Sequence, residues 1–244
     1  MTVNPALVSP PARVMAQDAL AIKQVFQSIH VESCPSSYNF HMHTVCSDGR
    51  LEPEALVEQA ISLGLKGFAI TDHHSVRGYQ RAKNWLEDWQ WRHPLPRRRA
   101  NGCLKPSLPR LWTGVEITAD LVGTEVHILG FAFNPEDTAM QVYLHGAPRG
   151  GDRLAAAVIK AIQTAGGLAV LAHPVRYRTM PEQLIPAAAD LGIDGVEAYY
   201  AYDNPTTWRP SPEKTETVEA LAKQFDLLKT CGTDTHGNSL LKRI

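Results

Sequence analysis

The chain has 244 residues, of which 44% are hydrophobic, which is enough for one sizeable core and predicts a single domain. Its formal net charge of -1 and pI near 6.8 exclude an overall electrostatic reason for binding nucleic acid or membranes, and leave only local patches open. The cysteines lack C-x-x-C spacing, which predicts a reducing compartment rather than a disulfide framework. They are Cys34, Cys46, Cys103 and Cys231.

Residues 1–35 are expected to form a helical extension that precedes the main domain, residues 36–244. This extension has no apolar run long enough to span a bilayer, and Asp18 and Lys23 interrupt any signal-peptide core. A cytoplasmic location without a membrane partner is therefore expected. Residues 12–29 have the spacing of an amphipathic helix, which favours packing on the main domain over binding of a partner.

The stretch YNFHMHTVCSDG, residues 38–49, is the first of two histidine-rich strand ends. Its short alternating apolar run predicts a strand, and the period of two places His41 and His43 on the same face. Asp48 follows in a Ser-Asp-Gly turn. Two imidazoles and one carboxylate are therefore expected to meet at one strand end.

The second stretch, AITDHHS at residues 69–75, comes after a helix predicted over 53–63. Proline in the first turn and Gly64 beyond the last are typical helix boundaries, so a β-α-β unit is predicted. A buried strand over 67–71 then ends in a polar cluster. The catalytic residues of α/β enzymes commonly lie at such strand ends. The cluster consists of Asp72, His73 and His74.

A helix is predicted over 78–91, and its three tryptophans favour packing over a base-stacking platform. The following stretch, residues 92–110, is rich in proline and reads as a basic insertion. Its charge could attract a polyanion, but a solvated loop is the favoured interpretation. The basic residues are Arg97, Arg98, Arg99, Lys105 and Arg110.

Residues 111–118 and 125–131 are predicted to form a hairpin, because their link is too short for a crossover helix. A turn centred on Leu121 and Val122 would place Glu116 directly opposite His127. Both side chains could then serve one metal cluster.

The rest of the chain alternates between helices and strands, and about seven strands are expected in all. A loop over 134–151 offers Arg149, and the next helix offers Arg153, to an anion. One strand ends in His173, and the last strand leads to Asp234 and His236. The predicted helices span 152–165, 181–191 and 212–228, and the strands span 168–172, 194–199 and 229–233.

Histidine and carboxylate ligands without thiolates favour manganese, iron or zinc in a reactive site over a structural zinc site. The candidates exceed the needs of one ion, so two or three divalent ions are expected. Such sites hydrolyse phosphate esters by a metal-activated hydroxide while the ions hold the phosphoryl oxygens. Neither a P-loop nor a G-x-G-x-x-G fingerprint is present, which argues against P-loop hydrolysis and dinucleotide redox chemistry.

The motif series HMHTVCSDG, ITDHH, GVEIT, EVHILGF, AHPVRY and GTDTHG resembles the PHP (polymerase and histidinol phosphatase) family of phosphoesterases over residues 38–237. The resemblance implies a distorted (β/α)7 TIM-like barrel, an α/β fold with a trinuclear metal site at the strand ends. The implied metal ligands are His41, His43, Asp48, His73, Glu116, His127, His173, Asp234 and His236. Asp72 and Arg176 are the implied catalytic residues, and Arg176, Tyr177 and His74 the implied substrate contacts.

The subgroup with SDG, HPxRY and D-x-H-G motifs implies a nucleotide phosphatase or an exonuclease. Its substrates would be nucleoside 3′,5′-bisphosphates or short oligonucleotides trimmed from 5′ to 3′, without stable duplex binding. The alternatives are a histidinol-phosphate-type phosphatase and a metal-binding regulatory module without catalysis. Two departures from the family are His74, where relatives often carry Asp or Asn, and a short interval from His127 to His173, which predicts a smaller cap.

Overall fold

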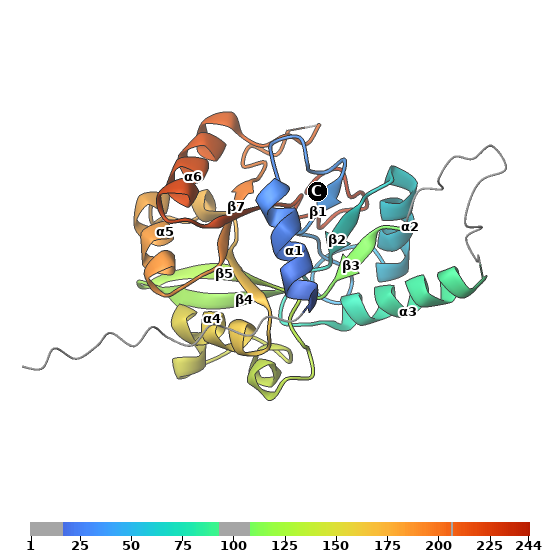
Figure 1. Cartoon of the computed structure of the whole chain (residues 1–244), viewed down its shortest axis with the longest axis horizontal. Helices are drawn as coiled ribbons and strands as arrows, with labels where there is room; N and C mark the ends of the chain where they lie inside the picture. The colour runs from blue at the N-terminus through green and yellow to red at the C-terminus, as the bar shows by residue number, and fades with distance from the viewer. Residues whose placement is uncertain (1–16, 93–107, 206) are drawn as a thin grey trace, which may run out of the picture.

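The computed structural model describes residues 17–92, 108–205 and 207–244, and these residues form two β-sheets with helices packed around them (Figure 1). The smaller sheet is parallel, in the order β1-β2-β3, with β1 at Tyr38–Asn39, β2 at Gly67–Ala69 and β3 at Arg110–Trp112. The larger sheet has the order β4-β5-β6-β7-β8. Its strands are β4 Gly114–Leu121, β5 Thr124–Phe131, β6 Leu168–Leu171, β7 Gly195–Tyr199 and β8 Leu228–Cys231.

Helices α2 and α3 lie beside the smaller sheet, and α4, α5 and α6 lie beside the larger one (Figure 1). Helix α2 has the predicted bounds, and Gly64 closes it with a φ of 72°. The α-helices are α1 Gln17–Ser28, α2 Pro53–Leu63, α3 Arg77–Arg92, α4 Ala155–Thr164, α5 Pro181–Asp190 and α6 Pro212–Gln224. Short 3-10 helices are η1 Thr138–Tyr143, η2 Gly150–Arg153 and η3 Pro174–Arg176.

Helix α1 packs its apolar side on the body of the protein, as predicted for this segment. Ala19, Ile22 and Phe26 are fully buried, and the ring of Phe26 meets that of Phe40 edge-on at 5.0 Å. The part of the extension before residue 17 and most of the basic insertion, residues 93–107, lie outside the described residues. No helix in the described part of the chain is both long and apolar enough to cross a membrane.

Two single backbone bridges join the two sheets. Met42 pairs with Thr235 beyond β1 and β8, and His73 pairs with Glu116 beyond β2. These bridges bring the ends of both sheets to one place. The α/β fold class is confirmed, whereas two separate sheets do not confirm the predicted seven-stranded barrel.

The strand predicted over 111–118 is in fact two strands, β3 and β4, in different sheets. Thr113 separates them, and Gly114 then passes so close to the carbonyl of Ile70 that an added Cβ would lie 2.4 Å from its oxygen. The chain therefore changes sheets at a point that a continuous β pattern conceals.

The predicted register of the hairpin between β4 and β5 was wrong. Glu116 pairs with Leu129, and Thr118 pairs with His127. The turn is Val122-Gly123, with φ values of 47° and 77°, one residue later than expected. A β-branched residue with positive φ is rare, so valine gave no signal for this turn.

Three other elements differ from their predicted form. The loop over 134–151 contains η1 and the start of η2, and α6 ends at Gln224 instead of continuing to residue 228. The packing interpretation of the tryptophans fails for Trp91, whose exposed fraction is 83%.

Candidate metal centre

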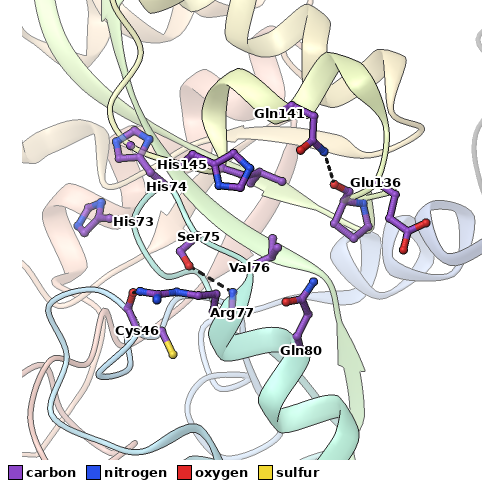
Figure 2. A pocket seen from close by; sticks show the side chains of 13 residues that line it. Cys46, His73, His74, Ser75, Val76, Arg77, Gln80, Glu136, Gln141 and His145 are labelled. Atoms are coloured by element: carbon purple, nitrogen blue, oxygen red, sulfur yellow. Dashed lines mark hydrogen bonds between the residues drawn. The ribbon is translucent and has the colours of Figure 1, made fainter.

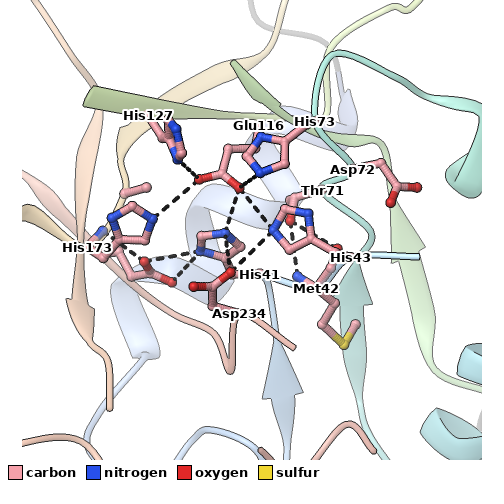
Figure 3. A network of polar contacts seen from close by, with 12 residues as sticks. His41, Met42, His43, Thr71, Asp72, His73, Glu116, His127, His173 and Asp234 are labelled. Carbon is pink, nitrogen blue, oxygen red and sulfur yellow. Dashed lines mark hydrogen bonds and ion pairs between the residues drawn. The ribbon is translucent and has the colours of Figure 1, made fainter. Parts of the chain in front are cut away.

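The predicted metal ligands come together at the ends of strands from both sheets (Figure 3). His41 and His43 follow β1, and their alternation places both rings on the same side, with centroids 5.3 Å apart. His73 follows β2, and the bridge to Glu116 holds it beside β4. His127 lies in β5, His173 follows β6, and Asp234 and His236 follow β8.

Glu116 lies at the centre of this cluster and is only 1% exposed. Its Oε2 lies 3.0 Å from Nε2 of both His41 and His43. Its Oε1 lies 2.7 Å from Nδ1 of His127 and 3.4 Å from Nε2 of His173. One carboxylate therefore faces two sets of imidazoles, the arrangement expected of a ligand shared between ions.

Two further carboxylates flank Glu116. Oδ1 of Asp234 lies 3.4 Å from Nε2 of His41 and 3.3 Å from Nε2 of His43. Asp48, whose side chain is 53% exposed, places Oδ2 3.2 Å from Nε2 of His236 and 3.7 Å from Nε2 of His73. The cluster therefore extends from a buried end at Asp234 to an exposed end at Asp48.

Three overlapping groups of donor atoms could each hold an ion, and within each group the atoms lie within 4.8 Å of one another. His173 adjoins the third group through Glu116. The groups are His41, His43, Glu116 and Asp234; His43, Asp48, His73 and His236; and His73, Glu116 and His127.

The polar atoms of the cluster fit divalent cations. Nδ1 and Nε2 of His43, Oε1 of Glu116 and Nδ1 of His127 are buried, yet they make no hydrogen bond of good geometry within the described part of the chain. Burial of unsatisfied polar atoms is costly, and imidazole nitrogens that share a focus with carboxylates are suited to manganese, iron or zinc. Bound cations would satisfy the carboxylate oxygen and one nitrogen of each ring, because the other nitrogen of a neutral imidazole carries the proton.

Charge balance within the cluster shifts the pKa values of its members. Burial alone would lower the pKa of His43, but Asp234 and Glu116 outweigh burial and raise this pKa to about 9. Burial would likewise raise the pKa of Glu116, but the neighbouring rings of His41 and His127 hold it well below its usual value. His73 differs, because burial lowers its pKa to about 4. The carboxylates are therefore ionised and ready to bind cations.

Residues at the cluster also have backbone conformations that side chains usually avoid. The φ values are 49° for His74, 26° for His173 and 51° for Asp234. Such conformations cost about 1–3 kcal/mol each and concentrate at functional sites. The site geometry is therefore maintained against a local conformational cost.

Glu197, in β7, supports the cluster and was missed by the sequence analysis. Its carboxylate is fully buried, with Oε1 3.0 Å from Nδ1 of His41, and its Oε2 accepts a hydrogen bond from the backbone N–H of His173 at 2.9 Å. Donation of the His41 Nδ1 proton to Glu197 leaves the Nε2 lone pair free for a metal. An acidic residue inside the apolar run GVEAYY was the available signal.

Replacing Glu197 by glutamine is expected to weaken metal binding about 10- to 100-fold, because His41 loses the carboxylate that fixes its tautomer. Mn²⁺ titration of the metal-free protein measures the effect. Glu219→Gln, in a half-buried pair with Lys229 away from the cluster, serves as a matched control and should bind Mn²⁺ normally. Normal affinity of the Glu197→Gln variant would contradict the positioning role.

Asp72, predicted as a catalytic residue, points away from the imidazoles (Figure 3). Its carboxylate accepts hydrogen bonds from Thr44 N–H and Oγ1, both at 2.7 Å, and from Ser47 Oγ at 2.9 Å. Thr44 and Ser47 belong to the loop that carries Asp48. This placement fits a positioning residue that fixes the loop.

His74 and Tyr177, predicted as substrate contacts, are both bonded to protein groups. Nε2 of His74 lies 3.1 Å from Oγ1 of Thr118 in β4. The hydroxyl of Tyr177 accepts a hydrogen bond from the N–H of His127 at 2.8 Å and donates to the carbonyl of Ala172 at 3.2 Å. The Tyr177 hydroxyl thus ties β5 to the residue before His173.

Arg176 lies where the sequence predicted a phosphate contact, and Arg243 joins it there. Nη1 of Arg176 and Nε of Arg243 donate to Oδ2 of Asp234, at 3.0 and 2.8 Å. The Tyr200 hydroxyl donates to the same oxygen at 2.6 Å. Both arginines line a cavity of about 390 Å³ above the metal-ligand cluster. Arg243 lies outside every recognised motif, six residues after Gly237, and no pattern in the sequence points to it.

Comparisons with known proteins agree with this arrangement. Residues 39–136 match the family model of the PHP domain. The 5′-3′ exoribonuclease of Haemophilus influenzae is 23% identical over 252 residues, 82% of this chain and 89% of that protein. The 5′-3′ exoribonuclease Rnm of Escherichia coli is 24% identical over 271 residues, 82% of this chain and 85% of that protein.

A solved structure described as a metal-dependent phosphoesterase, from Bifidobacterium adolescentis, has a similar fold. It has a TM-score of 0.63 at 24% identity, and the match covers 84% of this chain and 89% of that chain. The resemblance predicted from the motifs is confirmed by these findings. Residues 39–136 therefore match a PHP domain, and the three donor groups could hold divalent ions.

Proposed function

We propose that this PHP-domain protein hydrolyses phosphate esters of nucleotides, with nucleoside 3′,5′-bisphosphates or short 5′-phosphorylated oligonucleotides as substrates. Two or three divalent ions would act as cofactors. The observation that carries the proposal is the shared carboxylate of Glu116 beneath a cavity that two arginines line. Cations and guanidinium groups on one concave surface are suited to a phosphoryl group.

The reaction breaks the bond between phosphorus and the ester oxygen, and water supplies the new oxygen on phosphorus and the proton on the leaving alcohol. The bound ions would supply charge neutralisation and an activated water. Arg176 and Arg243 would orient the phosphoryl oxygens, and their shared partner Asp234 fixes both guanidiniums. We assign residues 36–244 to one phosphoesterase domain and residues 1–35 to its extension.

Release of phosphate or of mononucleotides with added Mn²⁺ tests the proposal on adenosine 3′,5′-bisphosphate, a 5′-phosphorylated short RNA and histidinol phosphate. We expect release from one of the nucleotide substrates and loss of this activity in the Asp48→Ala and His236→Ala variants. Both residues belong to the donor group that includes the exposed Asp48, so each substitution removes one ligand from the proposed metal site.

The alternative outcomes separate the other functions. Release from histidinol phosphate alone would overturn the nucleotide assignment in favour of a small-molecule phosphatase. No release from any substrate while Mn²⁺ is bound would favour the regulatory module. Mn²⁺ content of the purified protein, measured in parallel, distinguishes an inactive site from an unloaded one.

A further inference from the structure

A second and larger cavity, of about 820 Å³, adjoins the metal-ligand cluster. It lies between the residues that lead from β2 into α3 and the segment 135–146 that follows β5. Figure 2 shows Ser75, Arg77 and Gln80 on one side and Gln141 and His145 on the other. Its volume falls within the range of about 300–1,000 Å³ that is typical of sites for small ligands.

His73 joins the two cavities, because it lines both of them. The ring of His73 stacks on that of His43 at 4.7 Å, so one side of His73 belongs to the proposed metal site. Cys46 also lines the larger cavity and lies in the loop that carries Asp48. A substrate with its reacting phosphate at the cluster could therefore extend past His73 into the larger cavity.

Arg77 is a free cation at this cavity. Its guanidinium donates to the carbonyl of Cys46 at 3.3 Å, and no carboxylate within the described ranges forms an ion pair with it. Arg81, one turn further along α3, is instead bound by Glu52 and Glu54. The remaining donors of Arg77 are thus available to an anion, and the first turn of α3 adds a favourable helix dipole.

The rest of the lining suits a nucleoside. Val76 and Leu144 provide apolar surface for the flat faces of a base, and Gln80, Gln141 and His145 provide donors and acceptors for its edges and for the ribose. The cavity therefore combines a cation with a mixed polar and apolar wall, next to the proposed metal site.

We propose that this cavity binds the nucleoside of the substrate and that Arg77 binds a second phosphate, separated from the reacting phosphate by one ribose. The inference rests on the proposed function and specifies its substrates: nucleotides with two phosphates on the same nucleoside. Arg77 is thus a specificity-determining residue that distinguishes a nucleoside bisphosphate from a monophosphate.

The test compares kcat/KM for adenosine 3′,5′-bisphosphate with kcat/KM for adenosine 3′- and 5′-monophosphate. The wild type should prefer the bisphosphate by about 10- to 100-fold, the contribution of a charge-assisted contact to phosphate. Arg77→Ala should remove this preference by acting on the bisphosphate, with monophosphate hydrolysis unchanged. Arg77→Lys should retain part of it, and Arg81→Ala should leave it intact.

Each other outcome has a distinct meaning. An equal preference for the bisphosphate in the wild type and in Arg77→Ala would overturn the assignment of Arg77 while the phosphoesterase function stands. Equal hydrolysis of the bisphosphate and the monophosphates by the wild type would overturn the second-phosphate site itself. Failure of the wild type to hydrolyse any of the three would overturn the inference, and the nucleotide function would fall with it only if the 5′-phosphorylated RNA were also left uncut.

Discussion

Glu116→Gln is expected to lower phosphate release by at least about 10³-fold and to reduce the bound Mn²⁺. Glutamine keeps the shape of the side chain but loses the negative charge that faces His41, His43 and His127. Because Glu116 would be shared between ions, its loss should weaken the binding of more than one of them. Ions at such a site stabilise the transition state by several kcal/mol, so hydrolysis should slow strongly. The measurement is phosphate release in excess Mn²⁺, together with metal analysis.

Two further variants sharpen this test. Glu116→Asp keeps the charge but shortens the side chain, so it should not reach both sets of imidazoles and should also lose activity. Glu58→Gln makes the same chemical change on an exposed residue of α2 and should behave as the wild type. Full activity of the Glu116→Gln variant would rule out a shared carboxylate as the centre of the site.

The parts of the site that the sequence predicts are those that depend on local chain geometry. Alternation along an extended chain places His41 and His43 on one side, and both rings do face Glu116. Proline in the first turn and Gly64 after the last fix the bounds of α2, because their backbone preferences act within a few residues. His73, His173 and Asp234 follow the ends of parallel strands, so their convergence follows from the fold class.

The parts that the sequence does not predict depend on contacts between distant segments. Glu197 reaches His41 across 156 positions of sequence, and its apolar neighbours mark it as unusual without indicating which residue it contacts. Arg243 reaches Asp234 because the end of the chain folds back, with the N–H of His236 donating to the carbonyl of Arg243 at 2.6 Å. The roles of Glu197 and Arg243 therefore depend on contacts that form only in the folded protein.

The hairpin shows how a wrong register can still lead to a correct neighbourhood. Glu116 and His127 are diagonal rather than directly opposite, since His127 pairs with Thr118. Side chains on diagonal positions of one sheet face remain within reach of each other, and the contact between Glu116 and His127 is 2.7 Å. The prediction of proximity therefore held although the prediction of pairing failed.

The metal-free protein is expected to be most stable near pH 6.5. The folded-state pKa of His43 is raised to about 9, so its contribution to stability is fully present below pH 6.5 and is lost as the pH rises through 9. The folded-state pKa of His73 is lowered to about 4, so its contribution is present above pH 6.5 and is lost as the pH falls toward 4. Each shift corresponds to about 3 kcal/mol.

Thermal unfolding in EDTA between pH 4 and pH 9.5 checks this expectation. A change from pH 6.5 to either end of this range should lower Tm by about 6–12 °C. His43→Asn should reduce the alkaline fall, with the remainder due to His41, whose pKa the nearby carboxylates of Glu197 and Glu116 also raise. His30→Asn, an exposed histidine elsewhere, should not change it. A stability that is flat from pH 6.5 to 9.5 in the wild type would contradict the raised pKa of His43.

Added Mn²⁺ should prevent the fall in Tm that the metal-free protein shows above pH 6.5. Metal binds imidazoles that have lost their protons, so a proton on His43 competes with metal, and the competition weakens as the pH rises toward 9. Because an ion that binds only the folded state stabilises it, the stabilisation by Mn²⁺ should grow over the same range in which the metal-free protein weakens. The same buried carboxylates that hold protons on the histidines in the metal-free protein would therefore hold metal at higher pH.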